Sequence, residues 1–426
     1  MTMVWVLFIS FLVLMTFGVP VAYSLGISSA LYFLGTGMPL NTMVSRFFAG
    51  LDSFTLLCIP GFVLAGNLMS SGGISKHIIN FCNKLVGHIR GGLALVNVLD
   101  SMIFAGVSGT AAADVASLGT IMIPAMVDEG YDADFTVGIT AASSCIGPII
   151  PPSVPMIIAG TLTGISVSKM FLGGIIPGLL MGLGQTVVVQ YISKKRNYPK
   201  NERRATFREV LSSGKNAFWA LLMTVVILGT ILTGIVTPTE ASVIAVFYAL
   251  FVGFFIYREL TLKKLLVVLV NSIVSAAGIM ALVGFASIFA YILTKEQIPT
   301  MIANGLLAIT TNKFLLLLLM NLLLLFVGMF METIAALLIL FPVLLTVATS
   351  VGVDPIQFGV IAVLNLVIGL TTPPVGVCLF ISSSIAKISL SRATKGVMPF
   401  LIVNLLVLAA VTYFPPLTTW LVSLIY

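Results

Sequence analysis

Two proline-rich stretches interrupt apolar sequence and have the chemistry to hold a cation. They are GPIIPP at 147–152 and GLTTPPVG at 369–376. Proline lacks an N–H, and its ring clashes with the carbonyl one turn earlier, so neither stretch continues a regular helix and its peptide carbonyls lose their partners. Such carbonyls must be buried in protein or bind something, and a small hard cation such as sodium prefers oxygen ligands. Thr371 and Thr372 add hydroxyls, whereas a proline kink packed by neighbouring helices is the alternative.

Two further segments place small or polar residues inside long apolar runs. They are FAGVSGTAAADVASLG at 104–119 and FVGMFMETIAALLILFP at 326–342. Each run, of roughly 30–40 residues, exceeds the length of about 20 that one crossing needs, so we expect two re-entrant hairpins with these residues at their tips. At the first tip, Ser108, Gly109 and Thr110 would offer N–H groups and hydroxyls at a helix N-terminus, where a carboxylate is favoured. Packing of small residues between helices is the alternative.

Acidic residues within apolar segments are costly in a membrane and therefore mark candidate functional positions. They are Asp52, Asp100, Asp114, Glu240 and Glu332. Asp114 and Glu332 flank the two tips at near-equivalent positions. We expect each of them either to orient its tip or sense protons, or to cap the half-helix that follows. For Glu240, in VTPTEA, we expect an N-cap role.

The composition indicates which elements must position these residues. Hydrophobic residues make up 59% of the 426 positions and charged residues 8%, far outside the range of soluble domains. Apolar runs of about 20 residues recur along the chain, as membrane-spanning helices require. We therefore expect an all-α integral membrane protein, with about ten transmembrane helices, two re-entrant hairpins and two broken helices.

The basic residues indicate the topology. The one long polar stretch, at 194–215, is rich in Lys and Arg and is placed in the cytoplasm by the positive-inside rule. Counting outward from it gives ten crossings, at 2–17, 20–37, 52–71, 134–164, 168–192, 217–236, 240–257, 265–293, 356–386 and 397–414. The loops then assigned to the cytoplasm hold 17 of the 21 Lys and Arg, so the net charge of +7 reflects orientation and not a nucleic-acid partner. The expected location is the bacterial inner membrane.

The two halves of the chain repeat each other. A shift of 222 residues superposes unusual residues: Gly130 on Gly352, Asp132 on Asp354, Gly147 on Gly369, Pro151 on Pro373 and Pro152 on Pro374. Each half has five crossings, an odd number, so the second half is expected to be inverted. The first repeat covers 1–215, with scaffold helices 1–71, hairpin 92–128 and broken helix 134–164; the second covers 216–426, with scaffold helices 217–293, hairpin 314–350 and broken helix 356–386. Secondary transporters use this architecture, and here both hairpins and both broken helices would form one transport domain.

With GYD, GPIIPPS, LTTPP, TPTEA and the two tips in place, the chain resembles the large membrane subunit of a tripartite ATP-independent periplasmic (TRAP) transporter. The resemblance covers essentially the whole sequence. It implies an elevator movement of the hairpin-bearing domain and coupling to sodium. It also implies a small four-helix membrane subunit and a periplasmic substrate-binding protein as partners, and organic acids, notably sialic acids and dicarboxylates, as substrates. Membrane lipid is the remaining expected partner.

The resemblance also implies ligands for two sodium ions, mostly through backbone carbonyls. The first site would be formed by Gly106, Ser108, Gly147, Ile150 and Pro152, and the second by Gly328, Gly369, Thr372 and Val375. The substrate would contact Ser108, Gly109, Thr110, Glu332, Thr371 and Thr372. Two positions depart from the family pattern, which often has Ser where this chain has Ala105 and Asp where it has Glu332. With Ala105 in place of Ser, a ligand provided by the backbone carbonyl would remain, but one provided by the side chain would be lost.

Three other functions are weighed against a sodium-coupled importer. An intramembrane protease needs facing carboxylates or a zinc motif, and the sequence has neither HExxH nor GxGD. A passive anion channel is disfavoured by the paired interruptions, which are typical of transporters. An ATP-driven pump would need a nucleotide loop, and the sequence has no GxxxxGK[ST]. We therefore expect no enzymatic activity.

Overall fold

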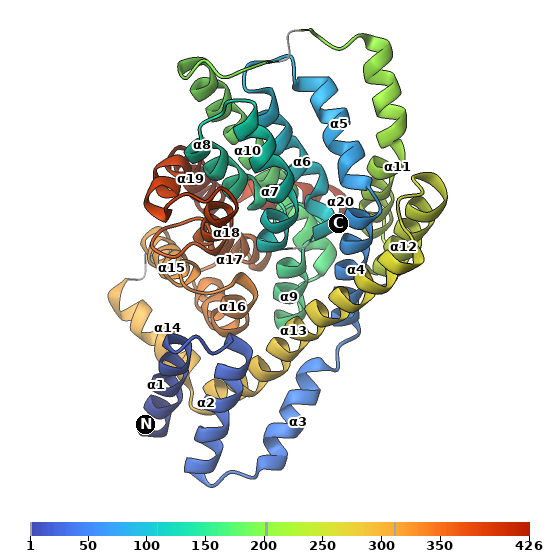
Figure 1. Cartoon of the computed structure of the whole chain (residues 1–426). Helices are drawn as coiled ribbons and strands as arrows, with labels where there is room; N and C mark the ends of the chain where they lie inside the picture. Colours follow the sequence, from blue (N-terminus) through green and yellow to red (C-terminus); the bar gives the residue numbers. More distant parts are fainter. Residues whose placement is uncertain (1, 109, 201–202, 311) are drawn as a thin grey trace.

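The computed structural model describes residues 2–108, 110–200, 203–310 and 312–426, which form a bundle of helices without a β-strand (Figure 1). Eight helical segments in these ranges are long and apolar enough to cross a membrane. They are Phe54–Ser71, Ala111–Asp128, Val167–Lys195, Phe207–Leu232, Pro238–Ile256, Leu262–Lys295, Thr333–Ser350 and Leu390–Tyr413. Shorter apolar helices lie among them. The predicted class, an all-α multi-pass membrane protein, is confirmed.

The helices follow one another in two halves. The first half contains α1 (Thr2–Thr16), α2 (Val21–Thr36), α3 (Leu40–Leu51), the 3₁₀ helix η1 (Phe54–Leu57), α4 (Cys58–Ser71), α5 (Ile74–Val86), α6 (Gly92–Ser108), α7 (Ala111–Asp128), α8 (Ala133–Ser144), α9 (Val154–Thr163) and α10 (Val167–Lys195). The second half contains α11 (Phe207–Leu232), α12 (Pro238–Phe251), the π-helix η2 (Val252–Ile256), α13 (Leu262–Lys295), α14 (Ile298–Ile309), α15 (Lys313–Gly328), α16 (Thr333–Ser350), α17 (Pro355–Gly369), α18 (Val377–Ile385), α19 (Leu390–Tyr413) and α20 (Pro416–Ile425).

Local sequence explains where α11 and α12 begin. Each starts with a capping box, in which an N-cap threonine and a glutamate three residues later satisfy backbone N–H groups. The N–H of Thr206 donates to Glu209 over 2.7 Å, and that of Thr237 donates to Glu240 over the same distance. Glu240 thus supports the cap, as its sequence context suggested, but the N-cap residue itself is Thr237.

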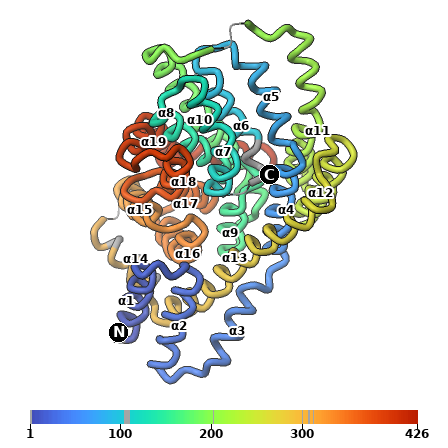
Figure 2. The backbone as a smooth tube through the Cα atoms, viewed as in Figure 1, coloured from blue at the N-terminus to red at the C-terminus, as the bar shows by residue number. Residues whose placement is uncertain are grey.

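Helices α1–α5 and α11–α14 form an outer group, called the frame below. Helix α12 packs against α4, and α11 packs against α5. The 34-residue α13, about 50 Å long, runs diagonally across the molecule and contacts α2, α3 and α4 (Figure 2). It therefore joins α1–α3 at one end of the frame to α4, α11 and α12 at the other.

Helices α6–α10 and α15–α20 form a second group, called the inner bundle. Helix α8 packs against α19, α17 packs against α15 and α16, and α18 packs against α7 and α8. Every residue of α17 from Gln357 to Gly369 is buried, as is every residue of α8 from Phe135 to Ser144. Because both helices are buried along almost their whole length, including polar residues such as Thr140 and Asn365, α8 and α17 form the centre of the bundle.

Both spans expected to be broken are interrupted. The segment 134–164 consists of α8 and α9, separated by residues 145–153, and 356–386 consists of α17 and α18, separated by 370–376. The helix pairs α6–α7 and α15–α16 occupy the positions of the two expected hairpins. Four short helices in the described residues, α3, α5, α14 and α20, lie outside both the ten crossings and the two hairpins expected from the sequence. The inverted orientation of the halves stays a prediction.

Candidate functional site

The first break leaves carbonyl oxygens available for a ligand. Its N–H groups are used in tight turns: Gly147 donates to Ser144, and Ile149 and Ile150 both donate to Ile146. Ser153 is the N-cap of α9, where its hydroxyl accepts from the N–H of Met156 and donates to the carbonyl of Pro148. No described residue donates a hydrogen bond to the carbonyls at 147, 150 or 152. These are three of the predicted ligands of the first sodium ion.

The second break is built in the same way but adds hydroxyls. The hydroxyls of Thr371 and Thr372 both donate to the carbonyl of Ile368 over 2.9 Å, and both side chains are buried. The N–H of Thr372 donates to Gly369, so that carbonyl has one lone pair left for a ligand. The carbonyls from Thr372 to Val375 receive no hydrogen bond from a described residue. Two kinds of oxygen that could bind a cation, peptide carbonyls and threonine hydroxyls, therefore lie in one short loop.

The second hairpin tip packs directly on the second break. A β-carbon placed on Gly369 would lie 2.6 Å from the Cα atom of Gly328, and one placed on Gly328 would lie 3.2 Å from the Cα atom of Gly369. The N–H of Gly376 also donates to the carbonyl of Met329 over 3.3 Å. The fold thus brings together Gly328, Gly369 and the loop with Thr372 and Val375, the residues expected to form the second sodium site. Their role as ligands stays a prediction.

The first hairpin tip is described only in part. Gly109 lies outside the described residues, and for Gly106 and Ser108 the structure describes only the helix α6 that contains them. Thr110 is the N-cap of α7, and its hydroxyl accepts from the N–H of Ala113 over 3.4 Å. The expected N-terminus of a half-helix therefore lies at this tip, directly after residue 109.

The acidic residues near the two tips have different surroundings. Glu332 is the N-cap of α16 and accepts from the N–H groups of Ile334 and Ala335 over 2.8 and 3.3 Å, as the capping alternative predicted. Asp114 lies in the first turn of α7, where Thr110 already provides the cap. It is fully buried, and its carboxylate has no hydrogen bond of ordinary length to a described residue, although the hydroxyl of Ser101 lies close to it. Its role stays open between orienting the tip and sensing protons.

A cavity of about 170 Å³ lies between the first tip and the frame. It is lined by Asn67 and Ser70 of α4, by Thr110 and Ser117 of the first hairpin, and by Ser275 of α13, together with apolar residues of the same helices. The amide of Asn67 also donates to Ser272 of α13 over 2.8 Å. Of the residues expected to contact substrate, Thr110 lines this cavity, whereas Glu332, Thr371 and Thr372 do not.

The polar residues with which the frame lines this cavity were not predicted from the sequence. Asn67 and Ser70 are three residues apart on α4, as are Ser272 and Ser275 on α13, so each pair lies on one helix face. Single polar residues inside apolar spans are a signal for a site or for helix packing. Only the contact between the helices shows which pairs face the hairpin.

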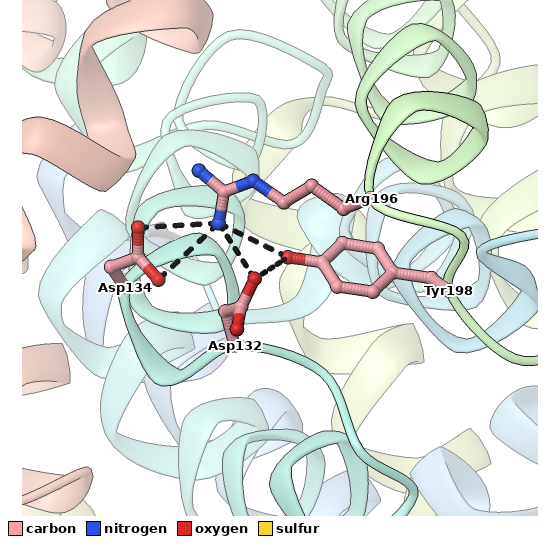
Figure 3. A network of polar contacts seen from close by, with 4 residues as sticks. All are labelled: Asp132, Asp134, Arg196 and Tyr198. Atoms are coloured by element: carbon pink, nitrogen blue, oxygen red, sulfur yellow. Dashed lines mark hydrogen bonds and ion pairs between the residues drawn. The ribbon is translucent and has the colours of Figure 1, made fainter.

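A polar network fastens the ends of the inner bundle helices (Figure 3). The guanidinium of Arg196, at the end of α10, lies 2.8 Å from Asp132 and 3.3 Å from Asp134 at the start of α8. The hydroxyl of Tyr198 donates to Asp132 over 2.8 Å. Hydrogen bonds from Tyr198 and Arg196 lower the pKa of Asp132, although partial burial opposes them. The network therefore holds the start of the first broken helix against the end of α10.

The first hairpin is tied to the same point. The N–H of Gly91 donates to the carbonyl of Pro199, and the N–H of Leu93 donates to the hydroxyl of Tyr131, over 3.1 and 3.3 Å. Hairpin, broken helix and α10 are thus connected at one end of the inner bundle. The GYD motif at 130–132 contributes three of the contacts at this end, through Tyr131 to Leu93 and through Asp132 to Arg196 and Tyr198.

The chain is similar to known transport proteins along almost its whole length. The family model for the DctM component of tripartite ATP-independent periplasmic transporters matches residues 8–417. The sialic acid TRAP transporter large permease protein SiaM of Vibrio cholerae is 44% identical, over 96% of this chain and 95% of that protein. The C4-dicarboxylate TRAP transporter large permease protein DctM of the same organism is 39% identical, over 98% and 97%.

Two further comparisons concern chain length and fold. The isethionate TRAP transporter permease protein DctMQ of Oleidesulfovibrio alaskensis is 40% identical over 96% of this chain, which spans 65% of that protein. The fold is similar to that of the YdaH transporter of Alcanivorax borkumensis, with a TM-score of 0.62 and 15% identity over 87% of this chain and 86% of that one. By its sequence and its helical fold, this chain belongs to the family of DctM components, the large permease proteins of TRAP transporters.

Proposed function

We propose that this permease imports an organic acid anion together with sodium, by moving the inner bundle relative to the frame. The observation that carries the proposal is the contact between the second hairpin tip and the second break. The backbones of Gly328 and Gly369 touch, and the loop 370–376 beside them offers carbonyls and threonine hydroxyls. A site whose ligands are peptide carbonyls and threonine hydroxyls suits a monovalent cation better than a divalent one.

Two sodium sites follow from the repeat. The second would use the carbonyls of Gly328, Gly369 and Val375 with the hydroxyl of Thr372. The first would use the carbonyls of Gly147, Ile150 and Pro152, with Gly106 and Ser108 from the tip. The thiol of Cys145 donates to the carbonyl of Val367 over 3.3 Å, so the start of the first break contacts the last turn of α17, directly before the second break. Binding of one ion would therefore affect the backbone that holds the other.

The cavity beside Thr110 supports a binding place for the organic acid. Its lining includes hydroxyls and an amide, and no basic residue among those that the structure places there. The negative charge of a carboxylate must then be balanced by the N-terminus of α7 and by sodium, which explains why the acid would need the ion. Relatives are named for sialic acid, C4-dicarboxylates, isethionate and 2,3-diketo-L-gulonate, all of which carry an acid group.

The size of the cavity supports movement between the two helix groups. At about 170 Å³ it is smaller than the roughly 300 Å³ usual for small-molecule sites. A sialic acid would fit only if the hairpin moved away from α4 and α13. The contacts of Arg196, Tyr198 and Tyr131 keep the inner bundle together during such a movement, as an elevator requires.

We also propose that the permease works with a small four-helix membrane subunit and a periplasmic substrate-binding protein. This chain spans 65% of the isethionate permease and 68% of the sialic acid permease protein SiaT of Haemophilus influenzae. The remaining length of these relatives is large enough for a second membrane component. On the frame, α13 has a row of exposed apolar side chains that a membrane partner or lipid would cover, including Leu266, Val270 and Val274.

The proposal is tested by uptake into proteoliposomes that contain the permease, its small subunit and the cognate binding protein. Radiolabelled sialic acid and a C4-dicarboxylate are supplied in turn, with an inward gradient of sodium or of potassium at equal ionic strength. We expect saturable uptake of one of the two acids in the sodium gradient and not in the potassium gradient. Equal uptake in both salts, or uptake that does not saturate, would show that the transporter is not sodium-coupled or that it is a channel.

A further inference from the structure

A second cavity, of about 400 Å³, lies between the end of α5 and the start of α11. This end of the molecule is the one that the positive-inside rule assigns to the cytoplasm. Three basic side chains line the cavity, Lys84, Arg203 and Arg204, together with His88 and one acid, Glu209. The transport mechanism proposed above uses none of these residues.

The charges in this cavity are not balanced. Glu209 accepts from the N–H and the hydroxyl of Thr206 over 2.7 and 2.9 Å and pairs with Arg203 over 3.4 Å. Within the described part of the chain, no acid lies within ion-pair distance of Lys84 or Arg204, although Lys84 is close enough to Glu209 to attract its carboxylate. The Nδ1 atom of His88 is buried and makes no hydrogen bond to a described residue. The cavity therefore offers three cations against one carboxylate, together with a ring nitrogen, an arrangement that suits a phosphate group.

Exposed apolar side chains stand next to this cavity. Leu85 follows Lys84 at the end of α5 and is 45% exposed, whereas Phe207 and Leu211, in the first two turns of α11, are 83% and 62% exposed. Helix α5 itself buries Ile74, Ile78 and Cys82 on one face, so it lies as an amphipathic helix against the bundle. A lipid would match both features, with its phosphate in the cavity and its acyl chains along the leucines and the phenylalanine.

We propose that this cavity binds the phosphate of an anionic membrane lipid. Both connections between the frame and the inner bundle at this end of the molecule contribute to it: His88 belongs to the link from α5 to α6, and Arg203 and Arg204 belong to the link from α10 to α11. A bound lipid would hold these two links together and slow the movement of the inner bundle. This effect on rate rests on the proposed function, whereas the binding itself does not.

The binding test uses the full chain, purified in detergent and titrated with dioleoyl phosphatidylglycerol, dioleoyl phosphatidylcholine or inorganic phosphate. Bound lipid is counted by native mass spectrometry. Each basic residue near an anionic lipid contributes about fivefold to affinity, so the double variant Lys84→Gln, Arg204→Gln should bind phosphatidylglycerol about 30-fold more weakly. It keeps the pair between Arg203 and Glu209, so the start of α11 is preserved.

The matched control is Lys194→Gln, Lys195→Gln, which removes the same charge from exposed positions at the end of α10, outside the cavity. We expect it to bind phosphatidylglycerol as the wild-type chain does. Equal weakening in both double variants would overturn the proposal, because the effect would then come from overall charge. Binding of inorganic phosphate that displaces the lipid at millimolar concentration, without preference for phosphatidylglycerol over phosphatidylcholine, would also overturn it, because the ligand would then be a soluble phosphate.

Discussion

The contact between Gly369 and Gly328 provides the sharpest test of the sodium site. In Gly369→Ala the new β-carbon would lie 2.6 Å from the Cα and carbonyl carbon of Gly328 and 2.9 Å from its oxygen, whereas ordinary contact begins at 3.4 Å. The hairpin tip must therefore move by about 0.8 Å, because both atoms belong to backbone and cannot rotate away. Forcing an extra carbon into a packed site costs about 1–3 kcal/mol.

This cost falls on the geometry of the proposed second sodium site. If all of it opposes ion binding, the affinity for sodium decreases by roughly 5- to 150-fold, since 1.4 kcal/mol corresponds to about tenfold. Thermal unfolding of the purified chain in increasing NaCl, with KCl keeping the ionic strength constant, measures this affinity without knowledge of the substrate. Uptake as a function of sodium concentration provides the second readout.

A graded series separates a specific effect from general damage. In Gly328→Ala the new carbon lies 3.0 Å from the carbonyl oxygen of Leu366, a milder overlap, so its effect should be smaller. In Gly229→Ala on α11 the new carbon meets nothing within 4 Å, so sodium binding should be unchanged. The reasoning is refuted if Gly369→Ala retains the sodium dependence of the wild-type chain, or if all three variants are affected equally.

Three further predictions concern the cap, the cavity and the polar network. Glu332→Ala should lower the free energy of unfolding by about 0.5–2 kcal/mol in chemical denaturation, whereas Glu332→Asp should retain stability because aspartate is also a good N-cap. Asn67→Ala should raise the KM for substrate uptake several-fold and leave the sodium dependence unchanged, because this amide lines the cavity and not the breaks. The lowered pKa of Asp132 means that its contribution to stability is present above the pKa of the unfolded chain and is lost as pH falls through the folded value. Asp132→Asn should therefore lose less thermal stability than the wild-type chain as the pH falls below about 4. The difference should be less than about 1 kcal/mol, because the side chain is half exposed.

Each of these predictions has a result that would contradict it. Equal losses in Glu332→Ala and Glu332→Asp would mean that the carboxylate does not act as a cap. A change in sodium affinity in Asn67→Ala would place this residue in the ion pathway and not in the substrate cavity. An acid profile of Asp132→Asn identical to that of the wild-type chain would mean that Arg196 and Tyr198 do not stabilise this carboxylate in solution.

The sequence alone predicted features that depend on neighbouring residues. The prolines at 148, 151 and 152 and at 373 and 374 cannot complete a helix, so both breaks could be located without knowledge of packing. That Glu240 takes part in a cap could be predicted for the same reason, because a cap is formed within one turn, but the N-cap residue is Thr237. The length of the apolar runs indicated the helix pairs α6–α7 and α15–α16, since two helices and a tip occupy more residues than one crossing, whereas their re-entry into the membrane stays a prediction.

Only the tertiary structure decided which of these elements meet. Gly328 and Gly369 are 41 positions apart, and their contact depends on how α15 packs on α17. The cavity beside Thr110 and the contact of Arg196 with Asp132 likewise join distant segments. Helices α8 and α17 place polar residues such as Thr140, Ser143 and Asn365 inside the bundle, but their sequences do not show which neighbour covers which face. Inside a membrane there is no hydrophobic driving force between helices, and the partners are selected by close packing and by hydrogen bonds between helices, which a single sequence does not display.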